Sequence, residues 1–281
     1  MSAKLKEIII KTKKRLFGAN LGNNVSIFHG NGLDFSEIKE YSYGDDVKKI
    51  NHKVTAKEQK PYVNVFNEER ELNIVVAFIV SGSIYFGSQV QKQEVMAEIM
   101  ALIGYSAIKN SDRFSAIFFD NKEIKAFKPT KSANTLYSAI EYALSIDPLG
   151  KEANYKELSQ YLLDTIKQKS IIFIIGDFYE EVDIEYLSAK HELYLINVRD
   201  PFEENPKFNS EVSLIDPTTL KSEQLNVNKA TINSFKKMLQ KQEQNLKLRA
   251  IKSGAKYTKV YTNEDIYIKL LALFGGRAWK V

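Results

Sequence analysis

Short, continuously apolar runs that alternate with amphipathic segments constrain the fold of this chain most. Residues 74–80 and 171–175 are apolar at every position, as in strands that are covered on both faces of a sheet. Segments such as residues 89–110 and 132–146 instead carry apolar side chains at helical spacing. The alternation from residue 73 to residue 198 therefore predicts an α/β fold, a doubly wound and mostly parallel sheet flanked by helices.

The chain continues on both sides of this alternation. We expect three parts: an N-terminal annex of residues 1–71, a core of residues 72–200 and a C-terminal extension of residues 201–281. Residues 1–17 predict a helix with Leu5, Ile8, Ile9 and Leu16 on its buried side. In the extension, the patterns predict a hairpin of residues 212–215 and 223–227, a long helix over 228–253 that ends at Gly254, a strand over 256–260 and a helix over 264–274.

Charge is distributed unevenly along the 281 residues, whose net charge is +5. Residues 1–15 hold six Lys or Arg against Glu7, and residues 221–260 hold ten against two Glu. Two basic flanks around an acidic body suggest docking surfaces rather than a uniform field, although lysine tracts on helices are commonly just solvated faces. Nucleic-acid binding through these flanks stays an alternative, but we expect no specific nucleic acid because no reading motif is present.

The sequence also limits where the protein works. No apolar run approaches the roughly 20 residues that span a bilayer, and the N-terminus lacks the apolar stretch of a signal peptide. The absence of cysteine excludes disulfides and thiolate sites. We therefore expect a cytoplasmic protein that does not span the membrane, with peripheral association left open.

Several short motifs stand before and after the first apolar run. They are Asp34-Phe35-Ser36-Glu37-Ile38-Lys39-Glu40-Tyr41, Gly44-Asp45-Asp46, Lys60-Pro61-Tyr62-Val63, Glu68-Glu69-Arg70-Glu71, Gly176-Asp177-Phe178 and Val198-Arg199-Asp200-Pro201. In this order they resemble the bacterial domain of unknown function 58 family, over nearly the whole chain. The resemblance implies a core like the von Willebrand factor A domain. One departure is Ile50-Asn51-His52-Lys53, where the family usually has Ile-Asp-Trp-Lys.

In von Willebrand A domains the strand ends hold a metal-ion-dependent adhesion site, with the pattern Asp-x-Ser-x-Ser, a Thr and a second Asp. The resemblance places Ser81, Ser83 and Asp177 at three of these positions. Ile79 stands at the first Asp position and the Thr position falls near Asn154. Because Mg²⁺ needs oxygen ligands, usually with one or two carboxylates, we expect a degenerate site that binds Mg²⁺ weakly or not at all. Alternatively, Ser81, Ser83 and Asp177 simply cap the segments that follow them.

Enzyme signatures are missing: the sequence has no phosphate-binding loop, dinucleotide fingerprint, HExxH motif or nucleophile elbow. His29, His52 and His191 lie in separate segments and indicate no catalytic dyad. We therefore expect no enzyme and no cofactor. The alternative from another class is a metal-dependent hydrolase at the strand ends.

The family resemblance implies a function beside a MoxR-type AAA+ ATPase. We expect a non-catalytic adaptor that acts with this ATPase and client proteins in assembly or maturation. The segment 34–57 mixes charged and aromatic side chains, which suits a polar, transient interface. The residues expected to bind the partner are Glu37, Glu40, Tyr41, Asp45 and Asp46. A turn cap is the plainer interpretation of the two Asp.

Overall fold

The computed structural model describes residues 2–18, 35–66, 71–206 and 210–275. The chain forms two compact units, one of residues 29–72 and one that combines residues 1–28 with residues 73–281. Each unit has its own secondary structure and is considered by itself.

A six-stranded sheet organises the larger unit, in the order β10-β7-β6-β3-β4-β5. All neighbouring strands are parallel except β4 and β5, which are antiparallel at one edge. The predicted doubly wound, mostly parallel sheet is therefore confirmed. The strands are β3 (Asn73–Ile79), β4 (Arg113–Phe119), β5 (Glu123–Thr130), β6 (Ile171–Gly176), β7 (Glu192–Arg199) and β10 (Lys256–Tyr261).

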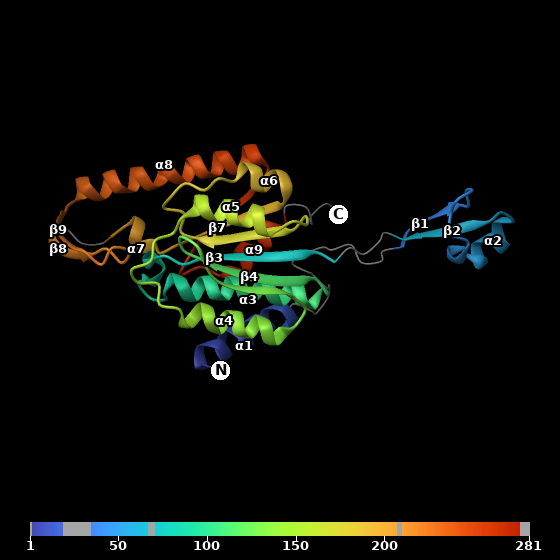
Figure 1. Ribbon diagram of the computed structural model, residues 1–281, viewed down its shortest axis with the longest axis horizontal. Helices are drawn as coiled ribbons and strands as arrows, with labels where there is room; N and C mark the ends of the chain where they lie inside the picture. Colours follow the sequence, from blue (N-terminus) through green and yellow to red (C-terminus); the bar gives the residue numbers. More distant parts are fainter. Residues whose placement is uncertain (1, 19–34, 67–70, 207–209, 276–281) are drawn as a thin grey trace. The chain divides into compact units, whose positions relative to one another are not determined.

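Helices cover both faces of this sheet (Figure 1). One face carries α3 (Lys92–Lys109), with α4 (Ala133–Ser145) and α1 (Ala3–Gly18) packed against it, and α9 (Ile266–Gly275). The other face carries α5 (Tyr155–Thr165), α6 (Glu185–Lys190) and α8 (Lys229–Ser253). The central strands β3 and β6 are buried on both sides, which explains why their sequences are apolar rather than alternating.

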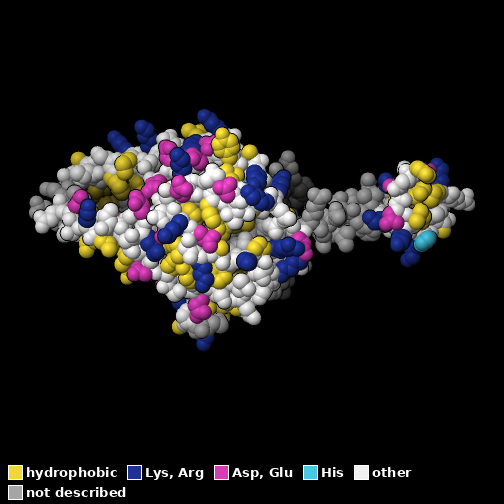
Figure 2. Space-filling view, in the orientation of Figure 1, with side chains coloured by type: hydrophobic (Ala, Val, Ile, Leu, Met, Phe, Trp, Pro, Cys, Tyr) yellow, Lys and Arg dark blue, Asp and Glu magenta, His cyan; other side chains and the backbone are white. Residues whose placement is uncertain are grey.

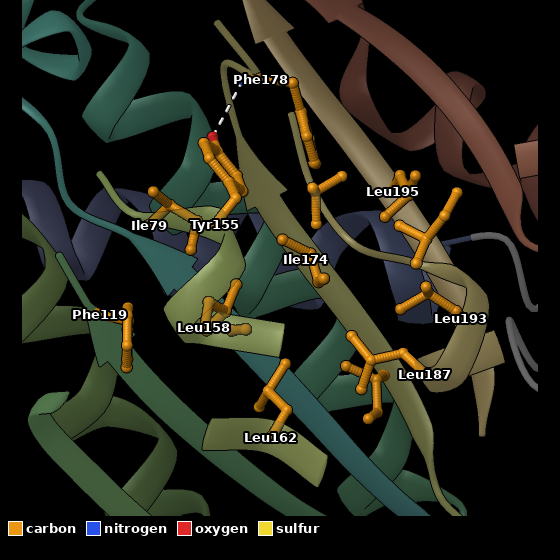
Figure 3. Packing of buried hydrophobic residues seen from close by; sticks show 14 of the residues in the cluster. Ile79, Phe119, Tyr155, Leu158, Leu162, Ile174, Phe178, Leu187, Leu193 and Leu195 are labelled. Atoms are coloured by element: carbon orange, nitrogen blue, oxygen red, sulfur yellow. Dashed lines mark hydrogen bonds between the residues drawn. The ribbon is translucent and has the colours of Figure 1, made fainter. Parts of the chain in front are cut away.

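The second face holds a cluster of buried hydrophobic side chains that reaches the strand ends (Figure 3). Ile79 from β3 and Ile174 from β6 pack there with Tyr155 and Leu158 from α5 and with Leu187 from α6. Burying an apolar side chain of this size contributes roughly 1.5–3 kcal/mol. This packing fixes the carboxyl ends of β3 and β6 next to the first turn of α5.

The short helix α7 (Pro201–Glu204) and a hairpin of β8 (Ser210–Ile215) and β9 (Ser222–Val227) follow β7. The hairpin turn docks on the strand ends, because Gly150 donates its backbone N–H to the carbonyl of Pro217 at 2.9 Å. A Cβ at Gly82 would stand 2.1 Å from the same carbonyl oxygen, so only glycine fits there.

The smaller unit is an antiparallel pair, β1 (Phe35–Glu40) and β2 (Tyr62–Phe66), joined through a 3-10 turn (Val47–Lys49) and α2 (His52–Glu58). Asn51 caps α2 by accepting from the Val54 N–H at 3.1 Å, and it donates to Asn64 at 2.9 Å. His52 is exposed, so it does not take the place of a packed aromatic ring.

The compact units do not follow the expected boundaries at 71 and 200. The helix α1 packs on α3 of the core because Leu5, Ile8, Ile9 and Leu16 are buried, as predicted. Its basic residues also pair with the core: Lys4 with Glu94 at 2.8 Å, Lys11 with Glu98 at 2.7 Å and Arg15 with Asp265. At the other end, β10 completes the central sheet rather than forming a separate extension.

Candidate functional site

The fold brings Ser81, Ser83 and Asp177 together at the carboxyl ends of β3 and β6, and these three residues are called the rim below. The Ser81 and Ser83 hydroxyl oxygens lie 2.8 Å apart, and Ser83 donates to a carboxylate oxygen of Asp177. Parallel strands end at the same edge of a sheet, which is why residues almost a hundred positions apart meet here.

A buried lysine occupies the position next to this carboxylate. Lys92 is the first residue of α3, and its side chain is fully buried. Its ammonium lies 3.6 Å from Asp177 and 2.6 Å from Glu203 of α7. The exposed fractions of the two carboxylate side chains are only 3% and 11%. A charge removed from water is tolerated when it is paired, so the three groups form one interdependent cluster.

The motif after β7 places Glu203 in this cluster. Asp200 caps α7 by accepting from the Phe202 N–H at 2.9 Å, and Glu203 accepts from the Asp200 N–H at 2.8 Å. Asp200 also accepts from the Ser88 N–H and from the Thr262 hydroxyl. Burial raises the pKa of Asp200, but these hydrogen bonds lower it more, so its carboxyl stays charged. The capping box thus holds one Glu203 oxygen while the other binds Lys92.

Two tyrosines complete the buried wall of the site. The Tyr155 hydroxyl accepts from the Phe178 N–H at 3.0 Å (Figure 3). The rings of Tyr155 and Phe178 stack with their centroids 5.1 Å apart. Phe178 has a φ of 49°, a left-handed conformation that is costly for a bulky residue. Tyr155 therefore holds the loop that presents Asp177.

The electrostatics of these groups argue against acid–base catalysis by the tyrosines. Burial raises the pKa of Tyr155 and of Tyr179, and the nearby Asp177 raises both further, so both phenols stay protonated. The Arg199 guanidinium lies 3.7 Å over the Tyr179 ring. Burial lowers the pKa of Arg199, whereas Tyr179 and the carboxylates of Asp177 and Glu203 raise it more, so it stays charged.

The residues at the rim do not fit a divalent cation. Ile79 is a buried core residue and offers no oxygen ligand. Asn154 caps α5 with its side-chain oxygen, which accepts from the Glu157 N–H at 3.0 Å. The Lys92 ammonium already supplies a positive charge beside Asp177, and a metal ion there would face like-charge repulsion. No cluster of three or more His, Cys, Asp or Glu side chains suited to a metal occurs in the described residues.

The alternative in which the rim residues cap helices is wrong for two of them. Ser81 precedes a 3-10 turn (Gly82–Tyr85) but makes no capping hydrogen bond with its side chain. The next helix after Asp177 is α6, and it begins at Glu185. Both side chains contact the Ser83 hydroxyl instead, and Asp177 also pairs with the buried Lys92 ammonium.

A groove of about 760 Å³ opens beside the rim, and we call it the rim groove. Its walls are the rim, α7, the hairpin turn and the first turns of α8. A hollow bordered by hydrophobic side chains is visible at this end of the unit in Figure 2. A concave site of this volume, largely apolar and with a few polar groups, is typical of ligand-binding sites. Its lining residues are Ser81, Ser83, Phe86, Glu152, Ala153, Tyr155, Asp177, Tyr179, Glu180, Phe202, Glu203, Pro206, Leu214, Asp216, Pro217, Thr218, Thr219, Val227, Thr231, Ile232 and Phe235.

The residues expected to bind a partner lie in the smaller unit, and two of them have local roles. Asp45 accepts from the Ser42 N–H at 2.9 Å and from Lys39 at 2.8 Å, and these bonds lower its pKa. Asp46 caps the 3-10 turn by accepting from the Lys48 N–H at 3.0 Å.

The other three partner candidates lie on or just after β1. Glu40 pairs with Lys60 at 3.3 Å on the surface, and Tyr41 is half-buried. Glu37 pairs with Val65 in the strand register, while its side chain lies outside the described residues. Two exposed side chains that follow β1, Tyr43 and Val47, offer apolar contact area beside these candidates.

Sequence reasoning missed Lys92, Glu203 and Arg199. A signal for Lys92 was present, because it lies three residues before Val95 and seven before Ile99 on the apolar side of α3. A lysine at such a position is buried and needs a partner. Which carboxylates it meets is a question of tertiary contact over more than a hundred residues.

The larger unit is a doubly wound, mostly parallel α/β domain in which a lysine ammonium stands beside the rim carboxylate. The chain belongs to the family described as protein of unknown function DUF58, whose model matches residues 37–245. The expected family membership is thereby confirmed.

Relatives of this chain occur in mycobacteria. The chain is 23% identical over 209 residues to the uncharacterized protein Rv1480 of Mycobacterium tuberculosis and to the uncharacterized protein Mb1516 of Mycobacterium bovis. The match covers 72% of this chain and 66% of each relative, so it leaves about a third of each relative unmatched. Neither the family description nor these relatives indicate a catalytic activity.

Two solved structures share a distant likeness. The conserved hypothetical protein BatB of Bacteroides thetaiotaomicron aligns with a TM-score of 0.43 at 14% identity, over 74% of this chain and 100% of that one. An aerotolerance-related membrane protein of Bacteroides fragilis aligns with a TM-score of 0.41 at 13% identity, over 73% and 98%. In the described part of the present chain, no helix combines the length and apolar character needed to cross a membrane.

Proposed function

We propose that this chain is a non-catalytic, cytoplasmic interaction module that binds a MoxR-type AAA+ ATPase and helps it act on client proteins in assembly or maturation. The non-catalytic part of this proposal rests on the contacts that the rim side chains already make with their neighbours. Ser83 donates to Asp177, and Lys92 pairs with both Asp177 and Glu203. A serine nucleophile needs an adjacent base, and Asp177 beside Ser83 is already paired with the Lys92 ammonium, while no histidine lines the site among the described residues.

The hydrolase alternative loses its chemical basis at the same place. Metal-assisted hydrolysis needs an ion that polarises a substrate or lowers the pKa of bound water. The Lys92 ammonium beside Asp177 offers a fixed charge with no open coordination position. The choice of a MoxR-type ATPase as partner rests on the family resemblance, and the exposed Tyr43 and Val47 of the smaller unit supply a surface for it.

Binding is tested with the purified chain immobilised and the MoxR-type ATPase of the same organism titrated over it. We expect saturable binding at micromolar concentration, with different affinities for the ATP-bound, ADP-bound and nucleotide-free states. Nucleotide-free binding should survive EDTA, because the rim of this chain needs no metal. An unrelated AAA+ ATPase of that organism serves as the control.

Two outcomes contradict the proposal. The adaptor function fails if the ATPase does not bind in any nucleotide state. The non-catalytic assignment fails if the purified chain hydrolyses ester or phosphoester substrates and the Asp177→Asn variant does not.

A further inference from the structure

The rim groove has an acidic lining without a basic counterpart. Five carboxylate residues line it, and no Lys, Arg or His does so among the described residues. Asp177 and Glu203 are both paired with Lys92. Asp216 accepts from Thr218 and Thr219 of its own turn. The two remaining carboxylates, Glu152 and Glu180, are therefore the ones that can meet a ligand.

These two residues lie next to each other without a cation between them. In the described part of the chain neither has a Lys or Arg partner, and both are exposed at the groove. Partial burial raises the pKa of Glu180, and the charges of Glu152 and Asp177 raise it further. A positive charge placed between Glu152 and Glu180 would relieve this repulsion. The described residues form no metal cluster, so an organic cation suits the place better than a metal ion.

The rest of the lining is apolar and partly uncovered. Phe86, Leu214 and Phe235 are 38%, 42% and 39% exposed, although large hydrophobic side chains are normally more buried. They come from three separate elements and face the same groove. The Phe86 ring also lies 6.2 Å from that of Phe202, which extends the apolar wall along α7. An occupant therefore needs apolar groups as well as a positive charge.

We propose that the rim groove binds an extended peptide segment of a partner protein, with a Lys or Arg side chain between Glu152 and Glu180 and apolar side chains against Phe86, Leu214 and Phe235. This inference rests on the proposed role as an interaction module, and it adds the chemistry of the segment that is recognised. Arg or Lys supplies the charge, and its neighbours supply the buried area that gives affinity.

The probe is a fluorescein-labelled peptide of sequence SLKFKLS, titrated against the full chain by fluorescence anisotropy near 150 mM salt. We expect micromolar binding and no binding of the matched peptide SLEFELS. The double variant Glu152→Gln/Glu180→Gln should weaken binding of the first peptide about tenfold, because it removes two charge contacts. The control variant Glu58→Gln/Glu157→Gln has the same net charge but lies outside the groove, and it should bind like the unmodified chain.

Several outcomes would overturn the inference. They are an absence of peptide binding, equal binding by the groove double variant, and displacement of the peptide by spermidine at the same concentration, which would reassign the groove to polyamines. The ATPase titration, repeated with the same variants, separates this inference from the proposed function. ATPase binding without peptide binding removes the groove assignment alone, and peptide binding without ATPase binding removes the adaptor role alone.

Discussion

Replacing Lys92 by methionine tests the central feature of the site. The Lys92 side chain is fully buried and its ammonium lies 2.6 Å from Glu203 and 3.6 Å from Asp177. Methionine keeps most of the volume of the lysine stem but removes the charge. Two carboxylates then lie out of water with only the Arg199 guanidinium as a nearby positive charge, and losing one partner of a buried ion pair is expensive.

The expected loss of stability is about 3–5 kcal/mol, the range for removing one partner of a buried pair. For a domain of this size each kcal/mol lowers the melting temperature by about 2–4 °C. The Lys92→Met variant should therefore melt about 6–20 °C below the unmodified chain in a calorimetric or circular-dichroism scan. Adding Glu203→Gln should recover part of the loss, because it removes one of the two unpaired charges.

A surface pair provides the matched control. Lys11 and Glu98 lie 2.7 Å apart, but their side chains are 47% and 15% exposed. Lys11→Met should therefore cost less than about 1 kcal/mol. The reasoning is refuted if Lys92→Met melts within about 2 °C of Lys11→Met, or if Glu203→Gln lowers the stability of Lys92→Met further.

Three further predictions concern the metal, the buried histidine and the acidic turn. Millimolar Mg²⁺ should leave the melting temperature unchanged within about 1 °C, because only a bound ion stabilises by mass action. A rise in melting temperature that Asp177→Asn abolishes would contradict the conclusion that Lys92, rather than a metal ion, pairs with Asp177. Burial lowers the pKa of His191, so the unfolded chain takes up its proton first and the free energy of unfolding should fall as the pH drops below about 6.5. His191→Gln should remove that part of the slope in urea unfolding measured at several pH values. Asp45→Ala should speed hydrogen exchange of the Ser42 amide, which its carboxylate holds at 2.9 Å; unchanged protection would leave Asp45 available to a partner.

Local pattern alone predicted most of the elements. The helix expected over residues 132–146 is α4 (Ala133–Ser145), and the strand expected over 171–175 is β6 (Ile171–Gly176). The hairpin strands expected over 212–215 and 223–227 were too short, since β8 and β9 run over Ser210–Ile215 and Ser222–Val227 and pair along their whole length. Periodicity reports which face of an element is buried, but pairing with a neighbour decides where an edge strand ends.

The sequence by itself determined the α/β class, the sheet and the meeting of Ser81, Ser83 and Asp177 at its edge. Apolar runs and helical spacing are properties of neighbouring residues, and parallel strands end at a common edge. Only the tertiary structure decided which side chains pair with Asp177 at that edge. Lys92 and Glu203 stand 111 residues apart, and no local pattern records that the α3 lysine is paired there. A buried charge must find its partner wherever the chain places one, so the character of the rim follows from packing.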